Sequence, residues 1–490
     1  MKKRLALLVA AAAVIFTGLY LVMPRTPERI ATGHSTLPSE AGAKTVLNAT
    51  YRHRQWVNVE AGSSSIRAFI VYPQRSNKAP VVVLSATGQG ASDWIRAVAD
   101  QVAAEGFIAI VPDVLSGLGP NGGDANDFPS ATAVADALER LGSREIARRT
   151  EAVRQYAIEL PSATSQSASL NFDSIGRVAT VAVGEHTASF SGNADVWPRA
   201  IAYLAKQTGD RPVGGVNPDA PEDHSAHIGM AMAQGRGFPK VPNLPASGFN
   251  AKGTLASSKL RKEFVDIPME HVKLHTWVEY PEGDGKAPIV IVMQHAPGMD
   301  EWQRALADQL ALEGFIAIAP DLNSGLGPNG GNFDSFVDAD SVSRAIARLN
   351  EKDILDRYIA ARNWGMKLAR ASGKSASIGF CMGGGNSFRL AAEVPELNAA
   401  VSYYGNPSKS LDFSKIHAPV LAFYGEEDAR VTSTLPATQA AMKENGKSFE
   451  AHNYPHTTHG FVEYQTLAGN LEALTDAWPK TIAFLKKHTQ

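Results

Sequence analysis

The alternation of hydrophobic and polar residues follows the same plan twice along the chain. Residues 65–72 and 271–280 alternate apolar and polar side chains, which predicts an early half-buried strand in each copy. The uninterrupted apolar runs at 80–84 and 288–293 predict strands that are buried on both faces. In the second copy, the spacing of apolar residues over 300–313 predicts an amphipathic helix. Each copy therefore begins with strands and continues with a helix.

A further apolar run at residues 315–319 predicts another strand after this helix. Strands that alternate with helices of this length indicate βαβ units, in which the strands lie parallel and the helices cover both faces of the sheet. The fold class that we predict is α/β, with a mostly parallel, doubly wound sheet in each copy.

An internal repeat sets the domain organisation. The segment 94–123 recurs at 302–331 with every position moved by 208 residues, and the correspondence continues without a gap on both sides. Self-similarity at a fixed offset over such a length indicates a duplication and not a chance likeness. We therefore predict two lobes, at residues 47–208 and 255–490.

Two segments outside the lobes have the composition of connecting chain. Residues 209–254 are rich in Pro, Gly, Asn and Ser and show weak periodicity, which indicates an extended linker. Residues 25–46 form a similar spacer before the first lobe.

The N-terminus has the layout of an export signal. Lys2, Lys3 and Arg4 precede an uncharged stretch at residues 5–23, close to the length of about 20 residues that spans a bilayer. We predict a signal anchor, or alternatively a cleaved signal peptide, within residues 1–24. With the basic end in the cytoplasm, the rest of the chain faces the periplasm from the inner membrane, or is secreted if the segment is cleaved. Contact with the membrane is expected through this segment only.

Composition narrows the classes of partner. At 490 residues the chain is longer than one ordinary core, in agreement with two domains. A net charge of -2 and 44% hydrophobic residues describe a globular protein without an electrostatic bias, which argues against nucleic acid as a partner. A small-molecule substrate fits this composition better.

The single cysteine, Cys381, carries the strongest chemical signal. It lies in the heptapeptide GFCMGGG, from Gly379 to Gly385, directly after the small-residue run at 375–378. A G-x-C-x-G sequence between a strand and a helix is the cysteine form of the nucleophile elbow, a sharp turn that lifts one side chain clear of the backbone. We interpret Cys381 as a nucleophile. The alternative is a thiol that serves only as a small buried hydrophobic group.

A nucleophilic thiol needs a base and an acid that orients the base. Two strand-like runs downstream, at residues 419–424 and 449–454, are each followed by suitable groups. The candidate acids and bases are Glu426, Glu427, Asp428, His456 and His459. Because the carboxyl ends of parallel strands meet at one edge of a sheet, these groups are expected to converge on the thiol.

The stretches GFCMGGG, YGEEDARV and HTTHGF together resemble the dienelactone hydrolase family, α/β-hydrolases with a cysteine nucleophile, from about residue 264 to the C-terminus. The resemblance implies that Cys381 is the nucleophile, Asp428 the orienting acid and His459 the base. It also implies an oxyanion hole made by the backbone N–H groups of Met382 and Ala296. The repeat extends this fold to two α/β-hydrolase-type lobes. The resemblance implies neither a metal nor an organic cofactor.

Two residues depart from the family's pattern and bear on the substrate pocket. His295 stands where the family usually has a glutamate, and the alternatives for it are pairing with the thiol or with the substrate, or capping of a loop. Glu463 stands where the dienelactone-binding members carry an arginine, and a carboxylate there repels an anionic substrate. A neutral ester or lactone is therefore expected. Asn329, in the loop at 325–331, is a further candidate for the pocket.

The first lobe looks like a degenerate copy of the second. Two alignments place either Asp173 or Gly184 at the position of the nucleophile, and neither residue lies in an elbow. Residues 194–208 already resemble the closing helix of the second lobe. We predict a truncated, inactive copy, which either packs against the second lobe and covers its active site or binds a ligand or a partner without reacting. An aspartate nucleophile is the alternative for Asp173.

The leading hypothesis is an exported, membrane-tethered hydrolase that opens carboxylic esters or lactones through an acyl-cysteine intermediate. One alternative is a thioesterase or acyltransferase that uses the same three groups, because the fold does not decide which acceptor enters the pocket. A second alternative is a non-catalytic binding or scaffold protein with a vestigial thiol.

Overall fold

The computed structural model describes residues 37–62, 64–173, 176–192, 196–210, 239–467 and 469–490, which all belong to one structural unit. The predicted signal anchor or signal peptide lies outside the described residues, as do most of the spacer and most of the linker. Among the helices that the structure does describe, none combines the length and the apolar character that crossing a membrane requires.

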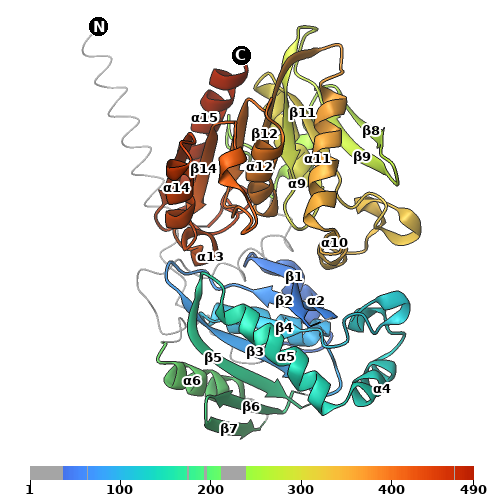
Figure 1. Cartoon of the computed structure of the whole chain (residues 1–490), viewed down its shortest axis with the longest axis vertical. Coiled ribbons are helices and arrows are strands. Elements are labelled where there is room, and N and C mark those ends of the chain that lie inside the picture. The colour runs from blue at the N-terminus through green and yellow to red at the C-terminus, as the bar shows by residue number, and fades with distance from the viewer. Residues whose placement is uncertain (1–36, 63, 174–175, 193–195, 211–238, 468) are drawn as a thin grey trace. The chain divides into compact units, whose positions relative to one another are not determined.

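The described part of the first lobe is built on a mixed sheet of seven strands (Figure 1). In sheet order the strands are β1 (Arg54–Ala61), β2 (Ser64–Val71), β4 (Ile108–Pro112), β3 (Ala79–Ala86), β5 (Ala163–Phe172), β6 (Val178–Val183) and β7 (His186–Ser191). Only β4, β3 and β5 pair in parallel, and the outer pairs are antiparallel. The mostly parallel sheet predicted for this lobe is therefore wrong. Short connections join β1 to β2, β5 to β6 and β6 to β7, and such connections link only antiparallel neighbours.

Helices cover both faces of the first sheet. They are α2 (Ala43–Ala49), α3 (Asp93–Ala104), α5 (Ser143–Ile158) and α6 (Val196–Thr208), whereas α4 (Ala131–Leu141) packs against α5 and the loop residues Leu115 and Ala125. Helices α2, α3 and α6 contribute to one buried cluster, and α5 packs against the other face through Val153 and Ala157. Ala43 and Leu47 are buried in the first of these clusters, so the folded part of the lobe begins inside the predicted spacer.

The second lobe contains a mostly parallel sheet, as predicted. Its eight described strands are, in sheet order, β15 (Phe449–Tyr454), β14 (Val420–Gly425), β13 (Ala399–Tyr403), β12 (Ala371–Phe380), β10 (Ala287–Met293), β11 (Ile316–Pro320), β9 (Lys273–Glu279) and β8 (Lys262–Pro268). All pairs from β15 to β11 are parallel, and only β9 and β8 are antiparallel. The carboxyl ends of the parallel strands thus meet along one edge of the sheet.

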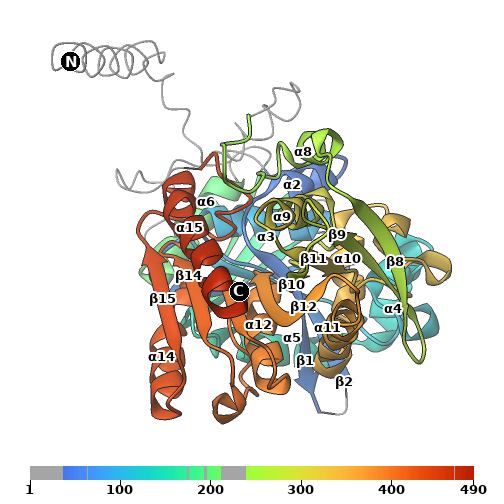
Figure 2. The ribbon, with the colours of Figure 1, turned by 90° about the horizontal axis from the view of Figure 1, so that it is seen from above.

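Helices lie on both faces of this sheet (Figure 2). They are α8 (Ala251–Ser257), α9 (Glu301–Leu312), α10 (Ala339–Ile346), α11 (Glu351–Gly365), α12 (Met382–Glu393), α13 (Ala429–Thr432), α14 (Leu435–Glu444) and α15 (Asn470–Thr489). Trp302 of α9 and Trp478 of α15 are buried in the cluster on one face. Tyr358 of α11 and Phe388 of α12 are buried in the cluster on the other. The sheet is therefore covered on both sides, as in a doubly wound fold.

The described end of the predicted linker packs against the second lobe. Leu244 and Ala246 are buried in the same cluster as Trp302, whose indole Nε1 donates a hydrogen bond to the carbonyl oxygen of Ala246 at 3.1 Å. Helix α8 then begins at Ala251. Residues 239–254 differ from the extended linker that composition predicts, because their few apolar side chains fill space in the core.

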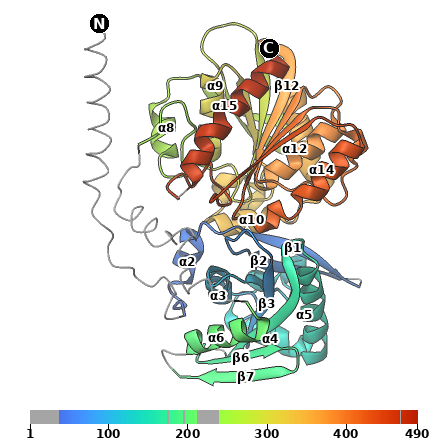
Figure 3. The ribbon, with the colours of Figure 1, turned by 90° about the vertical axis from the view of Figure 1, so that its left-hand side faces the viewer.

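Strand pairing shows how far the two copies stay alike. Strand β5 pairs with β3, and β12 with β10, in the same register and with an irregularity at the same place. This register puts Asp173, and not Gly184, at the position of Cys381. Beyond it the lobes differ, because β12 leads into α12 whereas β5 is followed by the hairpin β6–β7 at the edge of the sheet (Figure 3). The Oδ1 of Asp173 accepts hydrogen bonds from the N–H groups of Arg177 and Val178, so this side chain caps the turn into the hairpin.

Candidate active site

Cys381 lies in a strained turn between β12 and α12. Its φ of 55° and ψ of -117° are rare for a residue with a side chain. Glycines make the turn sterically possible. A Cβ at Gly379 would come to 2.0 Å from the carbonyl oxygen of Gly383, and one at Gly383 to 2.2 Å from that of Met293. The turn holds the thiol at the carboxyl edge of the sheet, as the G-x-C-x-G sequence predicts.

Asp428 and His459 approach the thiol from the ends of the next strands. Asp428 follows β14 and His459 follows β15. The Nδ1 of His459 lies 2.6 Å from Oδ2 of Asp428. A ring nitrogen of His459 lies within 4.8 Å of Sγ of Cys381, and all three side chains are buried. The structure thus brings together thiol, imidazole and carboxylate in the order that nucleophilic catalysis requires.

The rival candidates for acid and base lie together elsewhere. Glu426, Glu427 and His456 form a separate group in which each side chain is at least partly exposed. None of them lines the cavity beside Cys381. Among the described candidates, the geometry therefore selects Asp428 and His459.

The ionisation of the site follows from its charges. Burial raises the pKa of the Cys381 thiol, but the imidazoles of His53 and His459 outweigh it and hold that pKa well below its usual value. Burial lowers the pKa of His459, but the charges of Asp428 and Cys381 reverse the shift and raise it. Burial also opposes ionisation of Asp428, whereas Arg430 and His459 bring its pKa down to about 2. Together these shifts favour a thiolate beside an imidazolium.

Arg430, which no sequence motif marks as functional, lies next to Asp428. Its Nη2 lies 3.5 Å from Oδ2 of Asp428 and 3.2 Å from Nδ1 of His459. Because this ring nitrogen already faces the carboxylate, the guanidinium acts mainly on Asp428, which it keeps ionised. Its charge also lowers the pKa of His459, so it limits how strongly the imidazole holds a proton.

The first lobe supplies a second histidine to the site. His53 is buried, and its Nδ1 lies 3.6 Å from Sγ of Cys381. Its ring centroid is 4.5 Å from that of His459. Burial, followed by the charge of Arg430, lowers the pKa of His53 to about 4. Sequence reasoning misses His53 because the residue 208 positions later is Arg261, and no motif surrounds either position.

A small cavity of about 70 Å³ lies over the thiol, between residues of both lobes. The first lobe contributes Thr50, Tyr51, Arg52, His53 and Arg54, and the second His295, Ala296, Pro297, Cys381, Tyr404, His459, Gly460, Glu463 and Tyr464. The segment that leads into β1 therefore forms one wall of the site. This arrangement agrees with the expectation that the first lobe covers the active site.

The two residues expected to supply the oxyanion donors, Met382 and Ala296, lie directly after Cys381 and in the lining of the cavity, respectively. Met382 is the first residue of α12, where a backbone N–H has no partner within the helix. Ala296 lines the cavity next to Pro297, which has no N–H to offer. Tyr404 also lines the cavity, and among the described residues its buried hydroxyl has no hydrogen-bond partner. An unpaired buried hydroxyl is costly, so the hydroxyl of Tyr404 is available to a group that enters the cavity.

His295 and Glu463 are bound to each other. The Nδ1 of His295 lies 3.4 Å from Oε2 of Glu463, and its Nε2 lies 3.2 Å from Oδ2 of Asp300, the N-cap residue of α9. Burial opposes the charge on His295, but the two carboxylates raise its pKa to about 10. His295 is thus a cation held by two carboxylates. The sequence reveals both departures from the family pattern, but it does not reveal that the charges of His295 and Glu463 compensate each other.

Asn329 does not reach the site. It lies in the short 3-10 helix η3 (Pro328–Gly330) with φ 57° and is exposed. The described residues that line the cavity do not include it. The prediction that Asn329 belongs to the pocket is therefore not supported, because the loop turns outward after β11.

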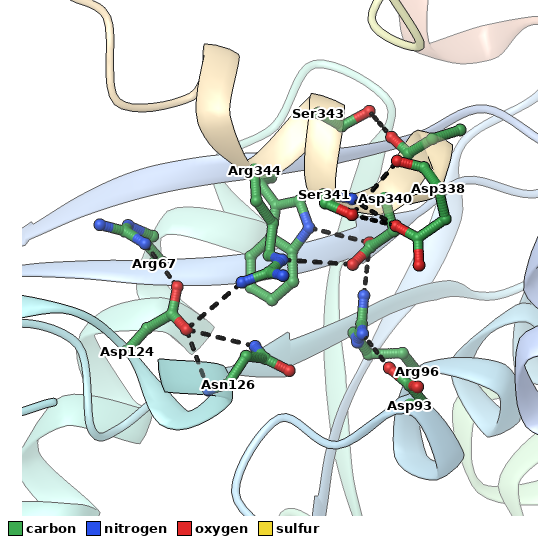
Figure 4. A network of polar contacts seen from close by, with 12 residues as sticks. Arg67, Asp93, Arg96, Asp124, Asn126, Asp338, Asp340, Ser341, Ser343 and Arg344 are labelled. Atoms are coloured by element: carbon green, nitrogen blue, oxygen red, sulfur yellow. Dashed lines mark hydrogen bonds and ion pairs between the residues drawn. The ribbon is translucent and has the colours of Figure 1, made fainter. Parts of the chain in front are cut away.

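Ion pairs and hydrogen bonds join the two lobes (Figure 4). Asp340 of α10 binds Arg96 of the first lobe and accepts a hydrogen bond from Nε1 of Trp56 at 3.2 Å. The backbone also bridges the lobes, since the N–H of Ala429 donates to the carbonyl oxygen of Arg75 at 3.0 Å. Ala429 directly follows the candidate acid, so the first lobe touches the loop that carries it.

Comparison with known proteins gives the same assignment for both lobes. The profile of the family described as "Dienelactone hydrolase family" matches residues 66–182 and 274–489. A relative from Saccharolobus solfataricus named "Putative carboxymethylenebutenolidase" is 29% identical over 44% of this chain and 94% of its own length. One of the same name from Escherichia coli is 28% identical over 46% of this chain and 86% of its own length.

A third relative, from Bradyrhizobium, is named "Probable 2-oxo-3-(5-oxofuran-2-ylidene)propanoate lactonase" and is 27% identical over 48% of this chain and 97% of its own length. These relatives are similar to one part of this chain each, whereas the family profile matches in both lobes. With matches over most of its length, the chain belongs to the dienelactone hydrolase family of hydrolytic enzymes.

Proposed function

We propose that the second lobe hydrolyses carboxylic esters or lactones through an acyl-cysteine intermediate. One observation carries this proposal: the thiol on the strained elbow faces an imidazole whose Nδ1 lies 2.6 Å from a buried carboxylate. The names of the relatives, which include a butenolidase and a lactonase, support the same class of reaction.

The proposed reaction has two halves. His459 takes the proton of Cys381, and the thiolate attacks the carbonyl carbon while the N–H groups of Met382 and Ala296 stabilise the oxyanion. His459 then gives its proton to the departing alkoxide, which leaves a thioester on Cys381. Water, deprotonated by His459, attacks the thioester, and the acid is released with the thiolate restored. Asp428 keeps the imidazole oriented and stabilises its charged form.

The pocket favours a small, neutral substrate. The cavity is only about 70 Å³, which leaves little room beyond the reacting group. Glu463 already pairs with His295, so it neither attracts a cation nor supplies the positive charge that would bind a carboxylate. A short-chain ester or an uncharged lactone fits these conditions best.

The direct test compares the intact protein with Cys381→Ala and His459→Ala on activated short-chain esters and small lactones. We expect both variants to lose at least about a hundredfold in kcat/KM. His271→Ala is a matched control, because this histidine is 85% exposed and lies outside the site. Equal rates for the intact protein and Cys381→Ala would contradict the cysteine mechanism.

Mass spectrometry of the quenched reaction separates hydrolysis from transfer. A thioester on the single cysteine that forms and decays in water supports hydrolysis. A stable adduct that is released only by an added alcohol or thiol would instead identify an acyltransferase. Absence of both adduct and turnover would favour a binding protein with a vestigial thiol.

The exported location remains a proposal that rests on the basic residues Lys2, Lys3 and Arg4 and the uncharged stretch behind them. Fractionation of cells that express the full chain, with a tag at the C-terminus, tests it. Recovery of the tag in the cytoplasmic fraction would contradict export.

A further inference from the structure

We propose that His53, Cys381 and His459 form a transition-metal site shared by the two lobes, and that a Zn²⁺ ion bound there holds the thiol inactive. The proposal rests on the proposed function only in taking Cys381 as the nucleophile that the metal blocks. Its first support is that two nitrogen donors and one sulfur donor converge, with all three donor atoms within 4.8 Å of one another.

The spacing suits a tetrahedral zinc ion. With Zn–S near 2.3 Å and Zn–N near 2.0 to 2.1 Å, two ligand atoms on a tetrahedron lie about 3.5 Å apart. The Sγ of Cys381 and Nδ1 of His53 are separated by 3.6 Å. Zn²⁺ binding therefore requires little change in the distance between Sγ of Cys381 and Nδ1 of His53. Three protein ligands leave the fourth position for water.

Both imidazoles are oriented as metal ligands usually are. Histidines that bind metals donate their second N–H to an oxygen, which fixes the ring and its tautomer. In His459 the second nitrogen lies 2.6 Å from Oδ2 of Asp428. In His53 the Nε2 lies 3.2 Å from Oε1 of Gln55, whose amide group donates in turn to the hydroxyl of Tyr72 at 3.3 Å. Each ring thus presents its other nitrogen to the thiol.

The donor set selects the class of metal. Thiolate and imidazole favour zinc and copper over Mg²⁺ and Ca²⁺, which prefer oxygen ligands. Arg430, near His459, opposes a cation at this place, while the thiolate and the ionised Asp428 favour it.

Binding is a ligand exchange without oxidation or reduction. The ion accepts a lone pair from Sγ and one from each imidazole, and the proton shared by Cys381 and His459 goes to solvent. The lone pair that would attack a carbonyl carbon is then bound to the metal. Removal of the ion by a chelator restores the thiolate and its activity.

The test uses the purified full chain, first stripped with a chelator and then titrated with Zn²⁺ by calorimetry or with Co²⁺ by absorption. We expect one equivalent at this site, release of a proton, and a thiolate-to-cobalt charge-transfer band. Cys381→Ser should abolish the band. His53→Ala should weaken Zn²⁺ binding at least about tenfold and raise the Zn²⁺ concentration for half-inhibition of ester hydrolysis by the same factor.

A control distinguishes this site from the other cluster of possible ligands, Glu426, Glu427 and His456. His456→Ala removes that cluster and should change neither the band nor the affinity. If His53→Ala unfolds, which circular dichroism would show, His53→Asn provides the same test with a smaller change in packing.

Zn²⁺ binding that His53→Ala and His53→Asn leave unchanged, or that His456→Ala abolishes, would overturn the proposal. Loss of hydrolysis on chelation would also overturn the inhibitory role. The metal titration needs no substrate, so its failure is separate from failure of the proposed function. If Cys381→Ala is inactive and the parent binds no Zn²⁺, only the metal-site inference is contradicted. If Cys381→Ala is as active as the parent, only the cysteine mechanism is contradicted.

Discussion

Removal of the Asp340 carboxylate should loosen the attachment of the two lobes. Asp340 binds Arg96, whose side chain is only 2% exposed, and also contacts Nε1 of Trp56 at 3.2 Å and Nε of Arg344 at 3.3 Å. In Asp340→Ala the buried guanidinium keeps one carboxylate partner, Asp93. Breaking a buried pair costs about 3 to 5 kcal/mol. Because Arg96 keeps this second partner, we expect a loss near the lower end, about 3 kcal/mol in the free energy of unfolding.

Urea unfolding of Asp340→Ala, followed by circular dichroism, measures this loss. Asp136→Ala, at an exposed position of α4, is the control and should stay within about 0.5 kcal/mol of the parent. A double-mutant cycle with Arg96→Ala should give a coupling energy of at least about 1 kcal/mol. A change below about 0.5 kcal/mol for Asp340→Ala, or a coupling energy near zero, would refute the assignment of this ion pair as a stabilising link.

The same pair predicts a pH dependence. Burial raises the pKa of Asp340, but Arg96 outweighs it, so the pKa is lowered in the folded chain. A carboxyl with a lowered folded pKa stabilises the protein above its unfolded pKa of about 4, and this contribution is lost as the pH falls through the folded pKa. The difference between the parent and Asp340→Ala should therefore shrink on acidification below about pH 4. A difference that stays constant down to pH 2 would contradict the electrostatic origin.

Three further outcomes are expected. Gly383→Ala should abolish esterase activity, because its Cβ would meet the carbonyl oxygen of Met293 at 2.2 Å; wild-type kcat/KM in this variant would contradict the elbow geometry. In His459→Ala, the pH profile of the rate at which iodoacetamide alkylates the single cysteine should shift toward higher pH, since the imidazole whose charge helps to lower the thiol pKa is gone. An unchanged pH profile would exclude the ion pair between Cys381 and His459. Tyr404→Phe should lower kcat without destabilising the fold, because its hydroxyl has no partner among the described residues; an unchanged kcat would remove this hydroxyl from the reaction.

The candidate catalytic residues of the second lobe could be predicted from the sequence, because each of them lies in a short local motif or follows a strand whose place in the sheet is given by the topology. The elbow is a short motif with a steric cause at Gly379 and Gly383. Asp428 and His459 follow strands that lie parallel in the same sheet, so their convergence on Cys381 needs no knowledge of side-chain packing.

The contribution of the first lobe could not be predicted in the same way. His53 reaches the thiol only because the lobes pack in one particular orientation, and no periodicity or motif encodes that contact. The prediction of a mostly parallel sheet in the first lobe failed for a different reason. The turns around β6 and β7 force antiparallel pairing, and apolar alternation alone does not distinguish parallel from antiparallel strands. The pairing of His295 with Glu463 likewise depends on the fold.

The hairpin after Asp173 has a consequence for any attempt to make the first lobe reactive. In the second lobe the residue after the nucleophile starts α12, and the partial positive charge at a helix N-terminus favours a thiolate and an oxyanion next to it. In the described residues of the first lobe, the next element after Asp173 is strand β6, and a strand offers no such field. Asp173→Cys would therefore create a thiol without a helix N-terminus beside it, and restoring chemistry there would require exchange of a whole structural element.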